Sequence, residues 1–168
     1  MDFAKLSAGR APPDDINVVI EIPQGGLVKY EFDHETGALT VDRFLETAMV
    51  YPGNYGFIPQ TLGGDGDPLD VLVIAPGPVL PGAVIRCRPL AALVMHDENG
   101  SDEKIVAEPL SFSSQQPGFS PAMREQIAHF FAHYKDLDAG KWVKIAGWAE
   151  ADEAGRLILA AIARAAGS

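Results

Sequence analysis

Three aspartates, Asp65, Asp67 and Asp70, lie within six residues in the middle of the chain, beside an apolar run that ends at Val73. Pro68 biases the residue before it towards an extended backbone, so Asp65 and Asp67 can point to one side of a loop. Carboxylates held this close repel one another at the low effective dielectric of a folded protein. Such oxygen-rich clusters are typical ligands of hard divalent cations. The segment therefore predicts a divalent-metal site, with Mg²⁺ as the natural candidate.

Two other interpretations of this segment were compared with the metal site. Asp, Gly and Pro are common in turns, so the segment also fits an ordinary turn-rich loop. A calcium-binding EF-hand loop is excluded, because counting from Asp65 puts Asp70 where glycine is required and Pro76 where glutamate is required. The residues of the segment alone leave the metal site and the turn-rich loop open.

Further charged side chains recur along the chain at the expected strand edges. The acids are Glu21, Glu31, Asp97 and Asp102, and the bases are Lys29, Arg43, Lys104 and Lys135. Glu21 interrupts an apolar run, so its side chain must either escape the core or line a polar cavity, and we expect the cavity. Lys29 and Glu31 share one face of a strand, where by themselves they fit a solvent-side ion pair.

The segment between Asp97 and Asp102 is a glycine-containing turn that joins two expected strands. This tip becomes functional only if it folds over the Asp65–Asp70 loop, and sequence spacing does not decide that. Tyr51, Tyr55 and Tyr134 could donate phenolic hydrogen bonds to phosphate oxygens, although tyrosines in such places also simply pack against the core.

The elements that must position these residues are mostly short strands. They are expected at 16–22, 27–32, 38–44, 55–58, 70–74, 84–95, 104–106 and 141–149. The polar segment 33–37 predicts a hairpin loop, and 111–120 predicts a surface loop. Short strands followed by helices indicate an α+β fold that is mainly β, with a small closed β-barrel as its core.

Two helices are expected in the second half of the chain. Ser120 and Pro121 suit the N-cap and the first turn of a helix, and Gly140 could end it. Apolar residues then follow at helical spacing and form one stripe, namely Met123, Ile127, Phe130, Phe131 and Tyr134. The second helix is expected over about 152–166.

Length and composition place the chain among globular proteins. Its 168 residues, 47% hydrophobic and 21% charged, predict one domain over 1–168, with 1–14 as an irregular lead-in. No apolar stretch approaches the roughly 18 residues of a membrane span, and the N-terminal residues do not resemble a signal peptide. We therefore expect a soluble, cytoplasmic protein without a membrane partner. A net charge of −10 argues against a nucleic-acid partner.

The single cysteine, Cys87, cannot form an internal disulfide, which agrees with a reducing compartment. It alternates with Arg86 and Arg88, so we expect it to face the core of a strand. His129 and His133 are four residues apart on the expected first helix and could hold zinc, but Phe130 occupies the place of the glutamate in a His-Glu-x-x-His motif. A structural role is the better interpretation of the two histidines.

The sequence resembles the family I soluble inorganic pyrophosphatases, in their bacterial form. The resemblance covers almost the whole chain after about residue 15, and the segment Asp65–Val73 matches the family's signature pattern. The matching segments are 18–23, 29–31, 41–43, 51–56, 65–73, 84–89, 127–131 and 134–137.

The resemblance implies a five-stranded OB-like barrel with helices beside it, and magnesium-dependent hydrolysis of pyrophosphate to two orthophosphates without a covalent enzyme intermediate. It implies that Asp65, Asp70 and Asp102 hold activating Mg²⁺ ions, that Asp97, Glu31 and Glu21 serve further Mg²⁺ ions or order water, and that Asp67 is the general base. The implied phosphate ligands are Lys29, Arg43, Tyr55, Lys104, Tyr134 and Lys135.

The resemblance also implies a homohexamer, with His129 and His133 as subunit-contact residues. Two other classes were compared with this enzyme. A non-catalytic metal-binding module would account for the acids but leaves the four bases Lys29, Arg43, Lys104 and Lys135 unexplained. An OB-type nucleic-acid binder should be basic, whereas this chain is acidic.

Overall fold

The structure is a computed structural model that describes residues 3–33, 36–111 and 119–167. Five of its strands form a closed hydrogen-bonded ring in the order β2, β5, β6, β9, β7, and the ring closes because β7 also pairs with β2. The pairing of β6 with β9 is parallel, and the other four pairings are antiparallel. The ring strands are β2 (Asp15–Ile22), β5 (Asn54–Phe57), β6 (Asp70–Val73), β7 (Val84–Asp97) and β9 (Lys104–Pro109).

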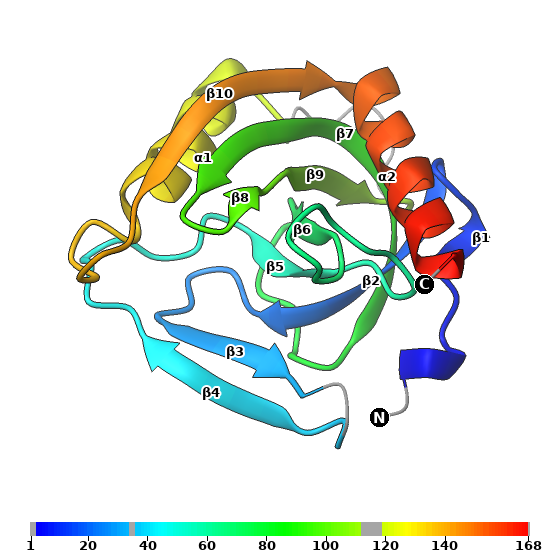
Figure 1. Ribbon diagram of the computed structural model, residues 1–168, viewed down its shortest axis with the longest axis horizontal. Helices are drawn as coiled ribbons and strands as arrows, with labels where there is room; N and C mark the ends of the chain where they lie inside the picture. The colour runs from blue at the N-terminus through cyan, green and yellow to red at the C-terminus, as the bar shows by residue number, and fades with distance from the viewer. Residues whose placement is uncertain (1–2, 34–35, 112–118, 168) are drawn as a thin grey trace.

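Three shorter or outer strands extend this sheet. They are β1 (Gly9–Ala11) beside β2, β8 (Gly100–Ser101) beside the end of β7, and β10 (Val143–Glu150) along β7. A separate two-stranded sheet is formed by β3 (Val28–Phe32) and β4 (Leu39–Phe44), which pair antiparallel. Figure 1 shows this hairpin below the ring in that view, joined to it by its connecting segments.

Apolar side chains fill the ring because the strands are rich in Val, Ile and Leu that face inwards. Ile16, Ile20, Val71 and Ile105 are fully buried in one core cluster, which the second helix covers with Ile158. A second cluster under the first helix contains Ile22, Tyr51, Leu72, Phe130 and Phe131. The ring therefore has an apolar core.

The first helix, α1 (Pro121–His133), begins as expected. Ser120 is its N-cap, and the Ser120 hydroxyl accepts a hydrogen bond from the backbone N–H of Met123 at 3.2 Å. The expected end at Gly140 was wrong, because the chain leaves the helix after His133. The backbone N–H groups of Asp136 and Asp138 instead donate to the carbonyls of His133 and Lys135, which makes successive turns.

The second helix, α2 (Ala151–Ala166), packs against β7, and α1 packs against β10. Figure 1 shows α1 and α2 at different sides of the ring. The expected mainly-β fold with two helices is confirmed, and its core is a closed ring of five strands. Neither helix in the described part of the chain is long and apolar enough to cross a membrane.

The expected strands are present within a few residues, and Cys87 is fully buried in β7 as predicted. The N-terminal lead-in differs from the irregular segment that we expected, because it contains a short 3₁₀ helix over Phe3–Lys5 and strand β1. Both elements are too short to show a periodic pattern. Residues 34–35 of the expected hairpin loop and 112–118 of the expected surface loop lie outside the described residues.

Candidate active site

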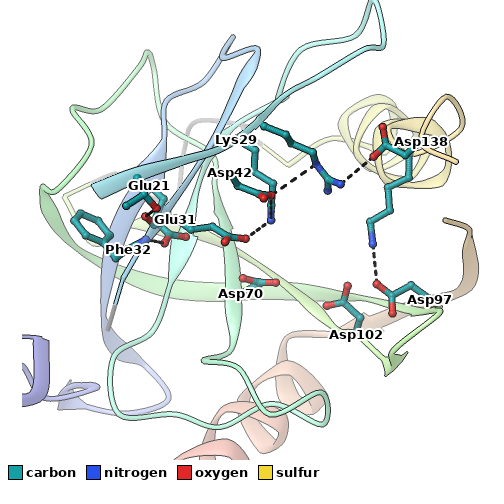
Figure 2. A network of polar contacts seen from close by, with 12 residues as sticks. Glu21, Lys29, Glu31, Phe32, Asp42, Asp70, Asp97, Asp102 and Asp138 are labelled. Carbon is teal, nitrogen blue, oxygen red and sulfur yellow. Dashed lines mark hydrogen bonds and ion pairs between the residues drawn. The ribbon is translucent and has the colours of Figure 1, made fainter. Parts of the chain in front are cut away.

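A cleft of about 330 Å³ lies between the β3–β4 hairpin and the adjacent end of the ring. All thirteen side chains that the resemblance assigned to the site line this cleft, whereas Tyr51, the third candidate tyrosine, is buried in the core outside its lining. The thirteen are Glu21, Lys29, Glu31, Arg43, Tyr55, Asp65, Asp67, Asp70, Asp97, Asp102, Lys104, Tyr134 and Lys135. Figure 2 shows several of them projecting from different strands into the same space. Glu31 and Asp102, which lie far apart in the sequence, therefore share one site.

The loop that carries Asp65 and Asp67 is shaped by hydrogen bonds at its base. The backbone N–H of Asp67 donates to Asp65 Oδ1 at 3.1 Å, and the N–H of Gly63 donates to the Asp67 carbonyl at 2.6 Å. Thr61 is buried, and its hydroxyl accepts from the N–H of Leu69 at 2.9 Å. These contacts hold an exposed acidic loop against the start of β6.

The turn between β7 and β8 lies beside the Asp65–Asp70 loop. The sequence could not decide whether these two segments meet. Asp97 Oδ1 accepts from the N–H of Asn99 at 2.8 Å, and the N–H of Asp102 donates to the carbonyl of Met95 at 2.9 Å. A small hollow beside the main cleft is lined by both segments, with Asp65 and Asp70 on one side and Asp102 on the other. The tip of the β7–β8 hairpin therefore contributes its acids to the same site.

Lys104 is the most buried cation of the cleft. It starts β9, and its Nζ contacts Asp70 Oδ2 at 2.5 Å and Asp102 Oδ1 at 2.6 Å. Burial by itself would lower the pKa of Lys104, but the two carboxylates outweigh burial and hold this pKa well above its usual value. Burial also raises the pKa of Asp102, against the attraction of Lys104. Lys104 therefore stays charged between two acids.

Lys135 follows α1 and forms a similar pair with Asp97. Its Nζ lies 2.8 Å from Asp97 Oδ2. Burial opposes the charge of Lys135, but Tyr134 and Asp97 raise its pKa overall. Burial by itself would raise the pKa of Asp97, but the hydrogen bond from Lys135 and the other nearby donors and cations lower this pKa overall. Both groups are therefore ionised at neutral pH.

The β3–β4 hairpin brings Lys29, Glu31 and Arg43 to the other wall. Lys29 Nζ pairs with Glu31 and, at 2.9 Å, with Asp42 Oδ2. Glu21 of β2 accepts a hydrogen bond from the N–H of Phe32 at 2.9 Å, which ties β3 to the ring. Burial, with the nearby negative charge of Asp70 and Glu31, raises the pKa of Glu21 to about 8 despite the Phe32 N–H. Glu21 therefore lines a polar cavity, as expected.

Tyr55 and Tyr134 have buried rings at the floor of the cleft. The Tyr134 ring stacks on Phe130 with centroids 5.2 Å apart, and the Tyr55 ring lies 6.0 Å from Phe131. Burial raises the pKa of both phenols, so both keep their O–H protons at neutral pH. Each phenol can therefore donate a hydrogen bond.

The cleft lining has more acids than bases, with eight carboxyl groups beside five cationic side chains. Within the described residues, no three carboxylates or imidazoles already converge at metal-binding distance. Lys104 and Lys135 instead neutralise part of the acid cluster. The donor set is made of carboxylate oxygens, which hard divalent cations prefer. The residues therefore fit such ions, which would offset the excess of carboxyl groups over cationic side chains in the cleft.

Comparison with known proteins decides the family. A family model described as inorganic pyrophosphatase matches residues 18–166. The chain belongs to the inorganic pyrophosphatase family. It is 56% identical to an inorganic pyrophosphatase of Caulobacter vibrioides over 98% of this chain and 97% of that protein. It is 53% identical to an inorganic pyrophosphatase of Gluconobacter oxydans over 98% and 99% of the two chains.

Solved structures agree with this assignment. The crystal structure of an inorganic pyrophosphatase from Thermus thermophilus is 40% identical, covers 99% of this chain and 100% of its own, and superposes with a TM-score of 0.94. A protein from Anaplasma phagocytophilum, described as an inorganic phosphatase, is 48% identical over 96% and 99% of the two chains, with a TM-score of 0.92. The expected membership of family I is confirmed, and the chain is an inorganic diphosphatase.

Four residues near the site were not given a role from the sequence. Asp42 binds Lys29, while Glu98 and Lys141 line the cleft. Asp138 contacts Arg43 at 3.0 Å from outside the cleft lining. Asp42 lies within the matched segment 41–43, and Glu98 directly follows Asp97, so their position was a usable signal. Asp138 directly follows the matched segment 134–137, but only the folded loop brings it to Arg43 of the hairpin.

Proposed function

We propose that this enzyme hydrolyses inorganic pyrophosphate to two orthophosphates with Mg²⁺, that Asp67 accepts the proton of the attacking water, and that no covalent enzyme intermediate forms. One observation supports this most strongly. The cleft gathers acids and bases from separate elements around a space of about 330 Å³, and its acids outnumber its bases. That combination suits a highly charged anion that arrives together with divalent cations.

In this proposal Asp65, Asp70 and Asp102 hold the activating Mg²⁺ ions. Asp97, Glu31 and Glu21 serve further Mg²⁺ ions that enter with the substrate, or order water around them. The burial of Glu21 and the negative charge around it, which raise its pKa to about 8, favour a nearby cation in the loaded enzyme. When bound, Mg²⁺ neutralises phosphate oxygens and lowers the pKa of coordinated water towards neutrality.

The position of Asp67 supports its proposed role as proton acceptor. It lies two residues from Asp65 on the exposed loop at the mouth of the cleft, and backbone hydrogen bonds hold that loop. Its neighbours Asp65 and Asp70 belong to the proposed metal set. A general base must reach the proton that it removes, and a carboxylate beside the proposed metal ligands would be close to a water bound by those ions.

The phosphate groups are held by Lys29, Arg43, Tyr55, Lys104, Tyr134 and Lys135 in this proposal. Lys104 and Lys135 are bound to carboxylates in this structure, so phosphate oxygens and metal ions would exchange those partners on binding. Fixed cations and phenolic donors stabilise charge that develops on the leaving phosphate. Direct attack by water then releases two orthophosphates, and no side chain needs to form a bond to phosphorus.

Phosphate release from pyrophosphate with and without divalent metal tests this function. We expect turnover with Mg²⁺, and its loss in excess EDTA, because the acidic cleft then repels the substrate and no other activated nucleophile is evident. Adding Mg²⁺ beyond the chelator should restore the rate, which controls for unfolding. Undiminished turnover in excess EDTA would contradict the metal-dependent mechanism.

We propose in addition that the enzyme forms the homohexamer of the bacterial enzymes that it resembles. His129 and His133 lie on α1 with rings 4.8 Å apart, and His133 Nδ1 contacts Asp136 Oδ2 at 2.7 Å on the surface. Such exposed polar groups can form paired contacts between symmetric copies. The mass of the protein in solution tests this, and a monomeric mass at micromolar concentration would contradict it.

A further inference from the structure

The loop between α1 and β10 reaches the β3–β4 hairpin through one carboxylate. Asp138 Oδ2 lies 3.0 Å from Arg43 Nη1 of β4, and Figure 2 labels Asp138 at one end of a dashed contact. Asp138 does not line the cleft, whereas Arg43 does. The carboxylate of Asp138 therefore reaches the cleft by direct contact through Arg43, and otherwise only by its charge.

The backbone of Asp138 is held by residues that line the cleft. Its N–H donates to the carbonyl of Lys135 at 2.9 Å, and its carbonyl accepts from the N–H of Lys141 at 3.2 Å. The side chain is only 17% exposed. The position of this carboxylate is therefore tied to the same turn that presents Lys135 and Lys141.

Arg43 requires an external support because its strand offers little. Strand β4 is mostly exposed, and it pairs with β3 rather than with the ring. Among the described residues the Nε of Arg43 is buried and has no hydrogen-bond partner, and it lies 3.8 Å from Asp42 Oδ2. A guanidinium has five N–H donors, so the contact with Asp138 leaves donors available for phosphate oxygens.

We propose that Asp138 is a positioning residue that holds the Arg43 guanidinium in place for a substrate phosphate. This inference rests on the proposed role of Arg43 as a phosphate ligand. An arginine that is already immobilised loses less side-chain entropy when it binds an anion, so the support of Asp138 increases affinity without touching substrate. Partly exposed ion pairs contribute little to folding stability, so the effect belongs mainly to binding.

The direction in which KM changes when Asp138 is removed distinguishes positioning of Arg43 from a simple effect of charge. Removing a negative charge near an anion site would, by charge alone, strengthen the binding of pyrophosphate and lower KM. Loss of a positioned guanidinium has the opposite consequence, because the substrate must then immobilise Arg43 itself. A rise in KM on removal of Asp138 therefore indicates positioning.

The test measures kcat and KM for pyrophosphate with saturating Mg²⁺. We expect Asp138→Ala to raise KM about three- to tenfold, with kcat changed less than about twofold. Asp138→Glu, which keeps the carboxylate, should recover most of the affinity. Glu150→Gln is the matched control, because Glu150 binds Arg124 through both carboxylate oxygens at 2.8 and 2.9 Å without touching the cleft, and its KM should not change.

A double-mutant cycle with Arg43→Ala decides whether Asp138 acts through Arg43. We expect Asp138→Ala to have no further effect on KM once Arg43 is gone, whereas multiplicative effects would overturn the inference. An unchanged or lower KM in Asp138→Ala alone would also overturn it. Asp138→Asn, which preserves side-chain shape, replaces the alanine variant if thermal unfolding shows that the latter is unstable.

The two proposals fail separately in this cycle. If Arg43→Ala leaves KM unchanged, the assignment of Arg43 as a phosphate ligand is wrong. If Arg43→Ala raises KM but Asp138→Ala does not, only the positioning role of Asp138 is wrong.

Discussion

The five-stranded ring and the β3–β4 hairpin hold the two walls of the cleft in different ways. Each ring strand is hydrogen-bonded to neighbours on both sides, and most of its inward side chains are fully buried. The hairpin forms a sheet of its own, and five of the six residues of β4 are exposed. The ring can therefore position its acids through the backbone, whereas the hairpin depends on a few side-chain contacts to position Lys29 and Arg43.

Several side-chain contacts attach the hairpin to the rest of the molecule, including the direct packing of Phe32 on Phe57 at 6.4 Å between ring centroids. Glu21 accepts from the Phe32 N–H, and Arg43 binds Asp138. Phe3 packs edge-on against Phe32 at 4.6 Å between ring centroids and against Phe57 of the ring at 5.6 Å. We infer that ring substitutions should lower stability first, while substitutions at these attachments should weaken substrate binding first.

The largest effect should come from the core of the ring. Ile20→Ala removes a fully buried side chain from β2, and we expect the free energy of unfolding to fall by about 2–5 kcal/mol because a cavity remains. The matched control is Val41→Ala on the hairpin, where the side chain is 51% exposed and the change should stay within about 0.5 kcal/mol. Denaturant unfolding measures both. If both variants lost the same free energy of unfolding, the proposed difference in stability between the ring and the hairpin would be wrong.

The next effect concerns chemistry on the ring side of the cleft. Asp67→Asn should lower kcat by roughly 10²-fold or more, because an amide cannot accept the proton of water, while the exposed side chain leaves folding intact. Phosphate release and thermal unfolding are measured together. Asp14→Asn, an exposed acid outside the cleft lining, is the control and should behave as the unmodified enzyme. Turnover at the unmodified rate in Asp67→Asn would exclude its role as general base.

The smallest effect should come from the aromatic support of the hairpin. Phe3→Ala removes the ring that bridges Phe32 and Phe57, so we expect KM for pyrophosphate to rise about three- to tenfold as Lys29 and Arg43 lose their orientation. Phe3→Leu keeps an apolar side chain of similar size and should preserve most of the affinity. If Phe3→Ala changes only the unfolding temperature and not KM, the N-terminal segment does not support the hairpin.

Local patterns predicted the strands and helices because each depends on nearby residues. The run of Val and Ile in β2 and the Ser120 N-cap of α1 are signals of this kind. The end of α1 was missed, since Gly140 looked like a stop while turns after His133 end the helix earlier. Strands β1 and β8 were missed because two or three residues show no period. The packing of Phe3 depends on partners about 30 and 50 residues away.

Residue types and order alone determined the chemistry that this protein can perform. The acids around Asp67, the recurring lysines and the matched segments are properties of the chain, and they identified the family before any contact was known. Only the tertiary structure decided that these groups meet, because convergence of Glu31, Asp70 and Asp102 depends on ring closure and on the docking of the hairpin. It also decided which side chains support them. Asp138 reaches Arg43 through a turn whose position no local pattern specifies.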